Sequence, residues 1–184
     1  IANGDCTFFN YAKSKKNILF SHSVQSIEKF IRKKQLISYL KYRPKVCFLS
    51  NYHKKNRSKI LYLFGNIDLR WAVDDIFINS QLSNNIDHNL AIFTSRPDRN
   101  LKILINIFKD LIEIKNKNLK LMVTDNNINI LSNSIFKRKL IDQRNLINDL
   151  SKSRICLMPG HKAELFCLAA EEAKELCIPV ITLG

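Results

Sequence analysis

The sequence predicts an α/β fold built on parallel sheets. Short apolar runs alternate with longer segments in which apolar residues recur at helical spacing, a pattern typical of parallel strands joined by covering helices. With 46% hydrophobic and 25% charged residues, the chain has enough apolar material for a packed core and too much for a disordered protein. No run approaches the roughly 18 uncharged apolar residues of a membrane-spanning helix.

Where the sequence begins and ends affects whether the expected sheets are complete. The sequence opens on Ile1 and closes at Gly184, directly after an apolar run. We expect both ends to be cuts within a longer protein. The usual length of about 150 residues for each domain would suit one or two domains here, but it applies to intact chains.

The first part of the chain is expected to form one strand, one helix and a second strand, with Pro44 before the second strand. A strand-like run at 60–64 follows, and then a Gly-Asn turn. Residues 79–89 are polar and loop-like, so we place a domain junction there. The expected domains are residues 1–85 and 86–184. The first three expected elements are a strand at 18–20, a helix at 26–42 and a strand at 46–49.

The second part of the chain has a more regular pattern. Apolar residues in 100–115 lie at helical spacing, and short apolar runs flank this segment. The order of elements is that of a Rossmann-like half. The expected strands lie at 90–94, 119–123, 135–136, 155–158 and 180–182, and the expected helices at 100–115, 142–151 and 165–176.

The net charge of +14, from 30 Lys and Arg against 16 Asp and Glu, raises the question of nucleic-acid binding. The basic residues are spread over the whole chain, and no aromatic and basic pattern of an RNA-binding module accompanies them. Ile, Asn and Lys are all abundant, and their codons are A/T-rich. An A/T-rich genome would therefore supply many lysines, and with them much of the positive charge, without any role in binding. Contact of a basic face with anionic lipid is favoured over nucleic-acid binding.

The five cysteines are odd in number, form no C-x-x-C pair and mostly lie in apolar runs. This pattern suits reduced, buried thiols in a cytoplasmic protein, including one that contacts the inner face of a membrane. Cys156, His161 and Cys167 lack the paired spacing of zinc ligands, so no metal is expected.

Two glutamates, Glu164 and Glu172, mark the candidate site. Their separation of eight residues is about two helical turns, so both can point to one side of a helix. Glu164 follows the strand end at 158–160, and ligands of open α/β sheets bind outside the carboxyl ends of strands. On spacing alone a solvated helix face is the commoner explanation, and Glu164 would also suit a positive helix N-terminus.

The run from Glu164 to Ala173, with the segment Pro179–Ile181, resembles the signature of a known family. This is the group 1 family of retaining nucleotide-sugar glycosyltransferases, whose GT-B fold has two Rossmann-like domains with parallel sheets. Both domains would be incomplete in this chain. Cys167 and Cys177 stand where the family usually has Gly. The matching residues are Glu164, Phe166, Leu168, Glu172, Ala173 and Pro179–Ile181.

The resemblance implies roles for the acidic pair and its neighbours. Glu172 would hold the ribose of the donor, and Glu164 would contact hydroxyls of the transferred sugar. Ionised carboxylates accept hydroxyl hydrogen bonds well, which fits both roles. Phe166 and Leu168 belong to the same donor-binding motif.

A second segment, 93–101, resembles the family loop in which an Arg and a following Lys clamp the donor diphosphate. Arg96 would take the first position and Arg99 the second, with Lys102 as the alternative. A guanidinium matches phosphate geometry, and the start of a helix adds a favourable dipole. Solvated cations at a helix start are the other explanation, which the helix dipole disfavours.

Two further segments resemble the family in other parts of the fold. His22, at a strand end, resembles the His in the cleft of the acceptor-side domain; a structural or exposed role is the equal alternative. The implied catalytic residues are His22, Arg96 and Glu164. The segment 136–140 resembles the strand and loop whose backbone holds the nucleotide base.

The implied activity is transfer of a hexose from a nucleotide-diphosphate sugar to a saccharide or lipid-linked acceptor, with retention. Cell-surface polysaccharide or glycolipid synthesis is the expected setting. No metal or cofactor is implied, because protein cations such as Arg96 and Arg99 would neutralise the leaving diphosphate. Two alternatives stay open: a non-catalytic or nucleic-acid-binding Rossmann-like protein, and a sugar-nucleotide epimerase of the same fold.

Overall fold

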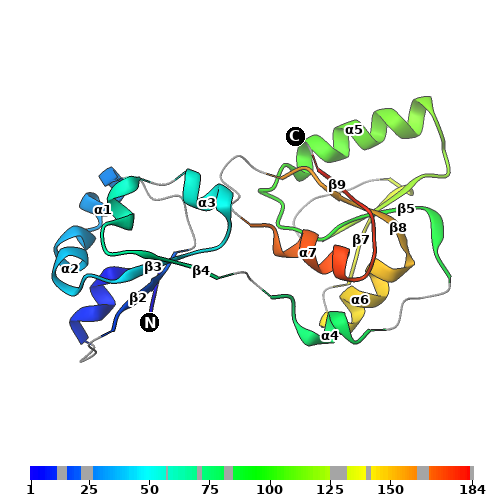
Figure 1. Cartoon of the computed structure of the whole chain (residues 1–184). Coiled ribbons are helices and arrows are strands. Elements are labelled where there is room, and N and C mark those ends of the chain that lie inside the picture. Colours follow the sequence, from blue (N-terminus) through cyan, green and yellow to red (C-terminus); the bar gives the residue numbers. More distant parts are fainter. Residues whose placement is uncertain are drawn as a thin grey trace. The chain divides into compact units, whose positions relative to one another are not determined.

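The structure is a computed structural model that describes residues 1–11, 16–21, 27–56, 58–69, 72–80, 85–124, 132–139, 142–160 and 166–182. The chain divides into two compact units, each built on a sheet with helices (Figure 1). The first unit is Ile1–Ala72 with Ala163–Phe166, and the second is Val73–Lys162 with Cys167–Gly184.

Within the described residues, the first unit holds a parallel sheet of four strands in the order β1-β2-β3-β4. Its core gathers aromatic side chains, among them Phe30 and Tyr39, whose rings meet edge to face at 5.4 Å between centroids. Such pairs add to the stabilisation from burial alone. The elements are β1 (Ala2–Asn3), η1 (Cys6–Tyr11), β2 (Ile18–Phe20), α1 (Ile27–Arg32), α2 (Gln35–Tyr42), β3 (Lys45–Phe48), α3 (Asn51–Lys55), η2 (Lys59–Tyr62) and β4 (Asn66–Asp68).

Two predictions for the first unit were wrong in detail. The helix expected over 26–42 is two helices, because the chain turns at Lys34, which has a left-handed φ of 55°. The run at 60–64 forms the 3₁₀ helix η2 and not a strand. A short apolar run does not distinguish a strand from a buried helical turn, and here Leu61 is buried while Leu63 is exposed. The strand β4 follows only after Gly65.

The described part of the second unit holds a parallel sheet of five strands in the order β7-β6-β5-β8-β9. Each strand and long helix expected from the sequence in this part is confirmed, with shifts at the ends; β5 begins earlier than expected, at Asp87. The elements are α4 (Asp75–Ile78), β5 (Asp87–Phe93), α5 (Leu101–Ile114), β6 (Lys120–Val123), β7 (Ile135–Lys137), α6 (Gln143–Lys152), β8 (Ser153–Met158), α7 (Leu168–Glu175) and β9 (Val180–Thr182).

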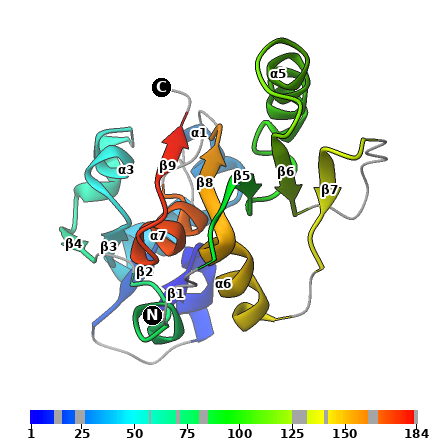
Figure 2. The ribbon, with the colours of Figure 1, turned by 90° about the vertical axis from the view of Figure 1, so that its right-hand side faces the viewer.

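The strand order of the second unit reverses beside β5. The chain runs from β5 outward through β6 and β7, then returns to the other side of β5 with β8 and β9. Figure 2 shows β5 and β8 side by side, at the point of reversal. In open α/β sheets, ligands bind at the carboxyl ends of the strands at such a switch point.

Helices cover both faces of this second sheet. Ala91 and Phe93 of β5 pack with the buried side of α5, whereas Ile92 between them packs with α4, α6 and α7. The alternation follows from the period of two residues in a strand. The strand β5, whose carboxyl end lies at the switch point, is therefore buried on both faces.

The division between the units falls between Ala72 and Val73, earlier than the expected boundary at 85/86. Phe77 of α4 is 1% exposed and belongs to the same core cluster as Ile92 and Ile147 of the second unit. The polar segment after residue 79 had suggested a junction. A polar composition is typical of surface loops, which occur within domains as well as between them.

The two cysteines that replace family glycines differ in backbone conformation. Cys167 has an extended backbone, with φ −102° and ψ 94°, so its position does not require glycine. Cys177 has a left-handed φ of 55°. It follows the end of α7, where the N–H of Cys177 binds the carbonyl of Lys174 and that of Ile178 binds Ala173. This is the Schellman arrangement, in which glycine is strongly preferred.

We expect Cys177→Gly to raise the free energy of unfolding by up to about 1 kcal/mol, because glycine adopts the left-handed conformation without steric cost. Cys167→Gly is the matched control and should lower it by about 0.5–1 kcal/mol, since the extended backbone there gains nothing from glycine. Urea denaturation of both variants gives the comparison. A shift of the same sign in both would contradict the assignment of strain to Cys177.

Candidate active site

The candidate site lies at the carboxyl ends of β5 and β8 in the second unit. Thr94 follows the end of β5, and Pro159 and Gly160 follow the end of β8. The side chain of Asn100, at the start of α5, donates a hydrogen bond from Nδ2 to the carbonyl of Gly160 at 2.6 Å. The loops that follow the two strands are thus joined at the switch point.

The loop between β5 and α5 and the first turn of α5 carry the three predicted donor-binding cations. Arg96 has a side chain that is 71% exposed and pairs with Asp98 at 3.1 Å. Arg99 is half-buried, and its N–H binds the carbonyl of Arg96 at 3.0 Å. Lys102 is exposed in the first turn of α5. An exposed ion pair contributes little stability, so a diphosphate can replace Asp98 as the partner of Arg96.

The N-terminus of α5 adds to the attraction of this loop for an anion. The helix is 14 residues long, and its N-cap side chain makes no capping hydrogen bond. Backbone N–H groups of a first turn lack partners within the helix and carry the positive end of the helix dipole. Cations and N–H groups together form a surface suited to phosphate.

Glu172 lies half-buried on α7, in the same unit. Burial raises the pKa of its carboxyl above the ordinary value, and the negative charge of Asp74 raises it further. Its neighbour Glu171 pairs with Lys174 at 2.7 Å, whereas no ion pair involves Glu172 within the part of the chain that the structure describes. A half-buried carboxylate whose pKa is raised by its surroundings is typical of a binding or catalytic position.

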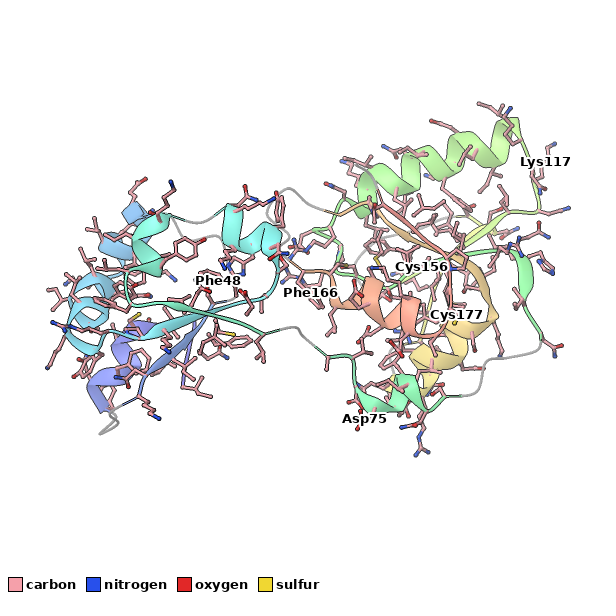
Figure 3. All side chains as sticks on the ribbon, viewed as in Figure 1. Phe48, Asp75, Lys117, Cys156, Phe166 and Cys177 are labelled. Carbon is pink, nitrogen blue, oxygen red and sulfur yellow. The ribbon has the colours of Figure 1, made fainter. Side chains whose placement is uncertain are left out.

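Cys156 of β8, labelled in Figure 3, is buried and interacts with Thr94, after the end of β5, and with Glu172. The pKa of the Cys156 thiol is raised to about 12, chiefly by burial; the Thr94 hydroxyl lowers it, and the nearby charges of Cys167 and Glu172 raise it. A thiol with this pKa stays protonated at neutral pH. We therefore assign Cys156 a packing role beneath the site.

The ends of β6 and β7 continue this edge of the sheet. The hydroxyl of Thr124, after β6, is buried and makes no hydrogen bond within the described residues. Arg138, after β7, has a side chain only 6% exposed that pairs with Asp149 at 3.0 Å. This ion pair joins the end of β7 to α6, and the Nη2 atom of Arg138 is buried and makes no hydrogen bond within the described residues.

The other predicted site residues are His22, Glu164, Phe166 and Leu168. His22 and Glu164 lie outside the described residues. Phe166 is half-buried and groups with the first unit. Leu168 is the first residue of α7 and is 37% exposed. Among the described residues, Arg96, Arg99, Lys102, Leu168 and Glu172 are therefore the predicted site residues that share the second unit.

Sequence reasoning missed two residues that shape this site. Asn100 ties the cationic loop to β8, and Asp74 influences the charge state of Glu172 while accepting a hydrogen bond from the N–H of Ile76 at the start of α4. A signal existed for each. Asn tolerates a left-handed backbone better than most residues, and Asp before a helical segment is a common cap.

No group of three or more His, Cys, Asp or Glu side chains in the described ranges could hold a metal ion. Among the helices described, none has the length and apolar character needed to cross a membrane.

Comparison with known proteins identifies the fold. No protein-family model matches the chain, and no curated protein matches it in sequence. The chain is similar to the crystal structure of TarM, a glycosyltransferase of the GT-B type, with a TM-score of 0.64 and 12% identity, over 91% of this chain and 36% of TarM.

Two other structures are similar at lower TM-scores. A putative UDP-N-acetylglucosamine 2-epimerase from Listeria monocytogenes has a TM-score of 0.45 and 10% sequence identity, over 97% of this chain and 59% of that one. UDP-GlcNAc 2-epimerase from Methanocaldococcus jannaschii has a TM-score of 0.41 and 12% sequence identity, over 97% of this chain and 63% of that one. The chain thus spans less than two thirds of each structure. The predicted fold class, α/β of the GT-B type with Rossmann-like parallel sheets, is confirmed.

Proposed function

We propose that this chain is part of a glycosyltransferase whose donor is a nucleotide-diphosphate sugar. The observation that carries the proposal is the cationic β5–α5 loop at the N-terminus of α5, joined to the end of β8 at the switch point of the sheet. This arrangement suits a diphosphate at the position where open α/β sheets bind nucleotides.

In the proposed complex, Arg96 and Arg99, with Lys102 as the alternative to Arg99, hold the diphosphate. Glu172 accepts hydrogen bonds from the ribose hydroxyls, and its half-buried position excludes competing water. Glu164 contacts the transferred sugar, and Phe166 and Leu168 complete the donor motif. These roles follow from the family resemblance together with the charges of the β5–α5 loop.

The proposed reaction transfers a hexose with retention to a saccharide or lipid-linked acceptor, in polysaccharide or glycolipid synthesis. As the sugar leaves the donor, negative charge develops on the diphosphate, and Arg96 and Arg99 would neutralise it without a metal. His22 is proposed to act in the acceptor-side cleft. The net charge of +14 suits a cytoplasmic protein in peripheral contact with anionic lipid.

A sugar-nucleotide epimerase of the same fold is the second candidate. Its reaction also begins with binding of a nucleoside diphosphate, so the same cationic loop and Glu172 would serve it. The acceptor distinguishes the two activities. Incubation with UDP- and GDP-sugars in the absence of any acceptor should leave the sugar unchanged for a transferase, whereas isomerisation of the sugar would assign the epimerase.

Arg96→Ala is expected to weaken binding of a nucleoside diphosphate by about 10- to 100-fold, because charge-assisted hydrogen bonds to phosphate contribute roughly 1.5–3 kcal/mol. Isothermal titration with UDP and GDP measures the effect. Arg154→Ala is the matched control, since Arg154 is exposed near the amino end of β8, at the opposite edge of the same sheet. Equal affinities of the wild type and both variants would rule out the proposed diphosphate site.

A further inference from the structure

Asn100 has an unusual conformation for a residue that precedes a helix. Its φ of 63° and ψ of 26° lie in the left-handed region, whereas an N-cap residue usually has an extended backbone and caps the first turn with its side chain. Asn is one of the few non-glycine residues that enter this region readily. In this chain the Asn100 side chain makes no capping bond.

The side chain of Asn100 binds a distant part of the second unit instead. Its Nδ2 donates to the carbonyl of Gly160, 60 residues further along the chain, at 2.6 Å. Gly160, directly after the end of β8, is also left-handed, with φ 69°. Two left-handed residues therefore meet between the carboxyl ends of β5 and β8, at the switch point of the sheet.

This bond restrains the turn that carries the candidate diphosphate cations. Two backbone bonds within the turn are local, from the N–H of Arg99 to the carbonyl of Arg96 at 3.0 Å and from the N–H of Leu101 to the carbonyl of Pro97 at 3.3 Å. Local bonds set the shape of the turn but not its position over the sheet. The bond from Asn100 to Gly160 ties the turn to the end of β8 and so restrains that position.

We propose that Asn100 is a positioning residue for donor binding, which holds the Arg96–Arg99 turn where both guanidinium groups reach one diphosphate. The inference rests on the proposed function. A loop that is held in its binding position before the ligand arrives loses little conformational freedom on binding, so its affinity is higher. Loss of the bond should therefore weaken contacts to the second phosphate of a nucleoside diphosphate. Contacts to the nucleoside and to the first phosphate should change less.

Asn100→Gly tests this role, because glycine keeps the left-handed backbone without strain and removes only the side-chain bond. Asn106→Gly is the matched control: Asn106 is exposed in the middle of α5, and glycine there destabilises the helix without touching the turn. For the wild type and both variants, titration calorimetry compares UDP with UMP and GDP with GMP, and thermal unfolding reports the stability.

For Asn100→Gly we expect the affinity for the bound nucleoside diphosphate to fall about tenfold, as for loss of one hydrogen bond, and the monophosphate affinity to change less than about twofold. Asn106→Gly should lower the thermal midpoint and leave both affinities unchanged. The role of Asn100 is overturned if its variant binds diphosphate like the wild type, or loses both affinities by the same factor.

The same titrations separate this inference from the proposed function. A wild-type chain that binds neither UDP nor GDP overturns the donor site itself, and the role of Asn100 with it. A wild type that binds a diphosphate, together with unchanged affinity in Asn100→Gly, overturns only the role of Asn100. The Arg96→Ala variant then shows whether the cationic turn still holds the ligand.

Discussion

Replacing Phe77 by Ala is expected to lower the free energy of unfolding of the second unit by about 3–5 kcal/mol. The Phe77 side chain is 1% exposed and packs in one cluster with Ile92 and Leu150. Its removal takes away buried apolar surface and leaves a cavity that the neighbouring side chains fill only in part. Urea denaturation followed by circular dichroism measures the loss of stability.

Hydrogen exchange shows which unit loses stability in Phe77→Ala. The amides of α6, α7 and β8 should exchange faster, whereas those of β2 and β3 in the first unit should keep their protection. Ile78→Ala is the matched control, because Ile78 is the next residue of α4 and is 55% exposed; it should change stability by no more than about 0.5 kcal/mol. Faster exchange confined to the first unit would return residues 73–85 to that unit.

Glu172→Gln is expected to weaken binding of a ribonucleoside diphosphate by about tenfold or more, because a charge-assisted acceptor of the ribose hydroxyls becomes a neutral one. The design compares each nucleotide with its 2′,3′-dideoxy analogue. The wild type should prefer the ribonucleotide, and Glu172→Gln should lose most of that preference while its affinity for the analogue stays the same.

Glu175→Gln is the control for this experiment, since Glu175 is exposed at the end of the same helix. It makes the same change of charge on α7 away from the half-buried position. If Glu172→Gln keeps the full preference for ribose, Glu172 does not hold the ribose, and the family resemblance has assigned it the wrong role.

Glu172→Gln, which is expected to weaken ligand binding, should raise the stability of the folded protein at neutral pH. The pKa of Glu172 is raised in the folded state by burial and by Asp74, so the folded protein binds the proton more tightly than the unfolded chain. The stability that this proton provides is present below the ordinary pKa of 4.5 and is lost as pH rises through the higher pKa of the folded state. Glu172→Gln should therefore be more stable than the wild type at pH 7, and this gain should shrink as pH falls toward 4.5.

A variant that binds less and folds better would indicate a residue retained for function. Binding sites often contain groups that the fold alone would disfavour, and a half-buried carboxylate beside a second acid is such a group. A stability of Glu172→Gln below that of the wild type at pH 7 would instead give Glu172 a structural role. The two measurements on one variant thus distinguish a ligand-binding acid from a structural one.

Much of the second unit was predicted from the sequence, because its elements have strong periodic patterns. The apolar residues of α5 recur at helical spacing, and Asp142 before α6 caps that helix by accepting from the N–H of Asn145 at 2.7 Å. These are local signals, which a single segment contains. In the first unit such signals were weaker: the run at 60–64 is equally compatible with a strand and with η2.

The candidate site was predicted in part, through motifs whose spacing can be counted along the chain. Arg96 and Arg99 do lie in a loop between a parallel strand and a long helix, as their resemblance to a diphosphate loop implied. Contacts between distant segments could not be counted in this way. The bond from Asn100 to Gly160 joins positions 60 residues apart, and no local pattern encodes it.

The sequence by itself determined the α/β class, the parallel strands and the cationic loop, because hydrophobic period and turn chemistry act over a few residues. Only the tertiary structure decided that α4 joins the second unit, that Cys177 is left-handed while Cys167 is not, and that Asp74 lies close enough to raise the pKa of Glu172. The place of α4 and the effect of Asp74 on Glu172 depend on packing between segments far apart in the chain, where burial and distance set the energy. The left-handed backbone of Cys177 depends on the hydrogen bonds that end α7, which become visible only once the helix is formed.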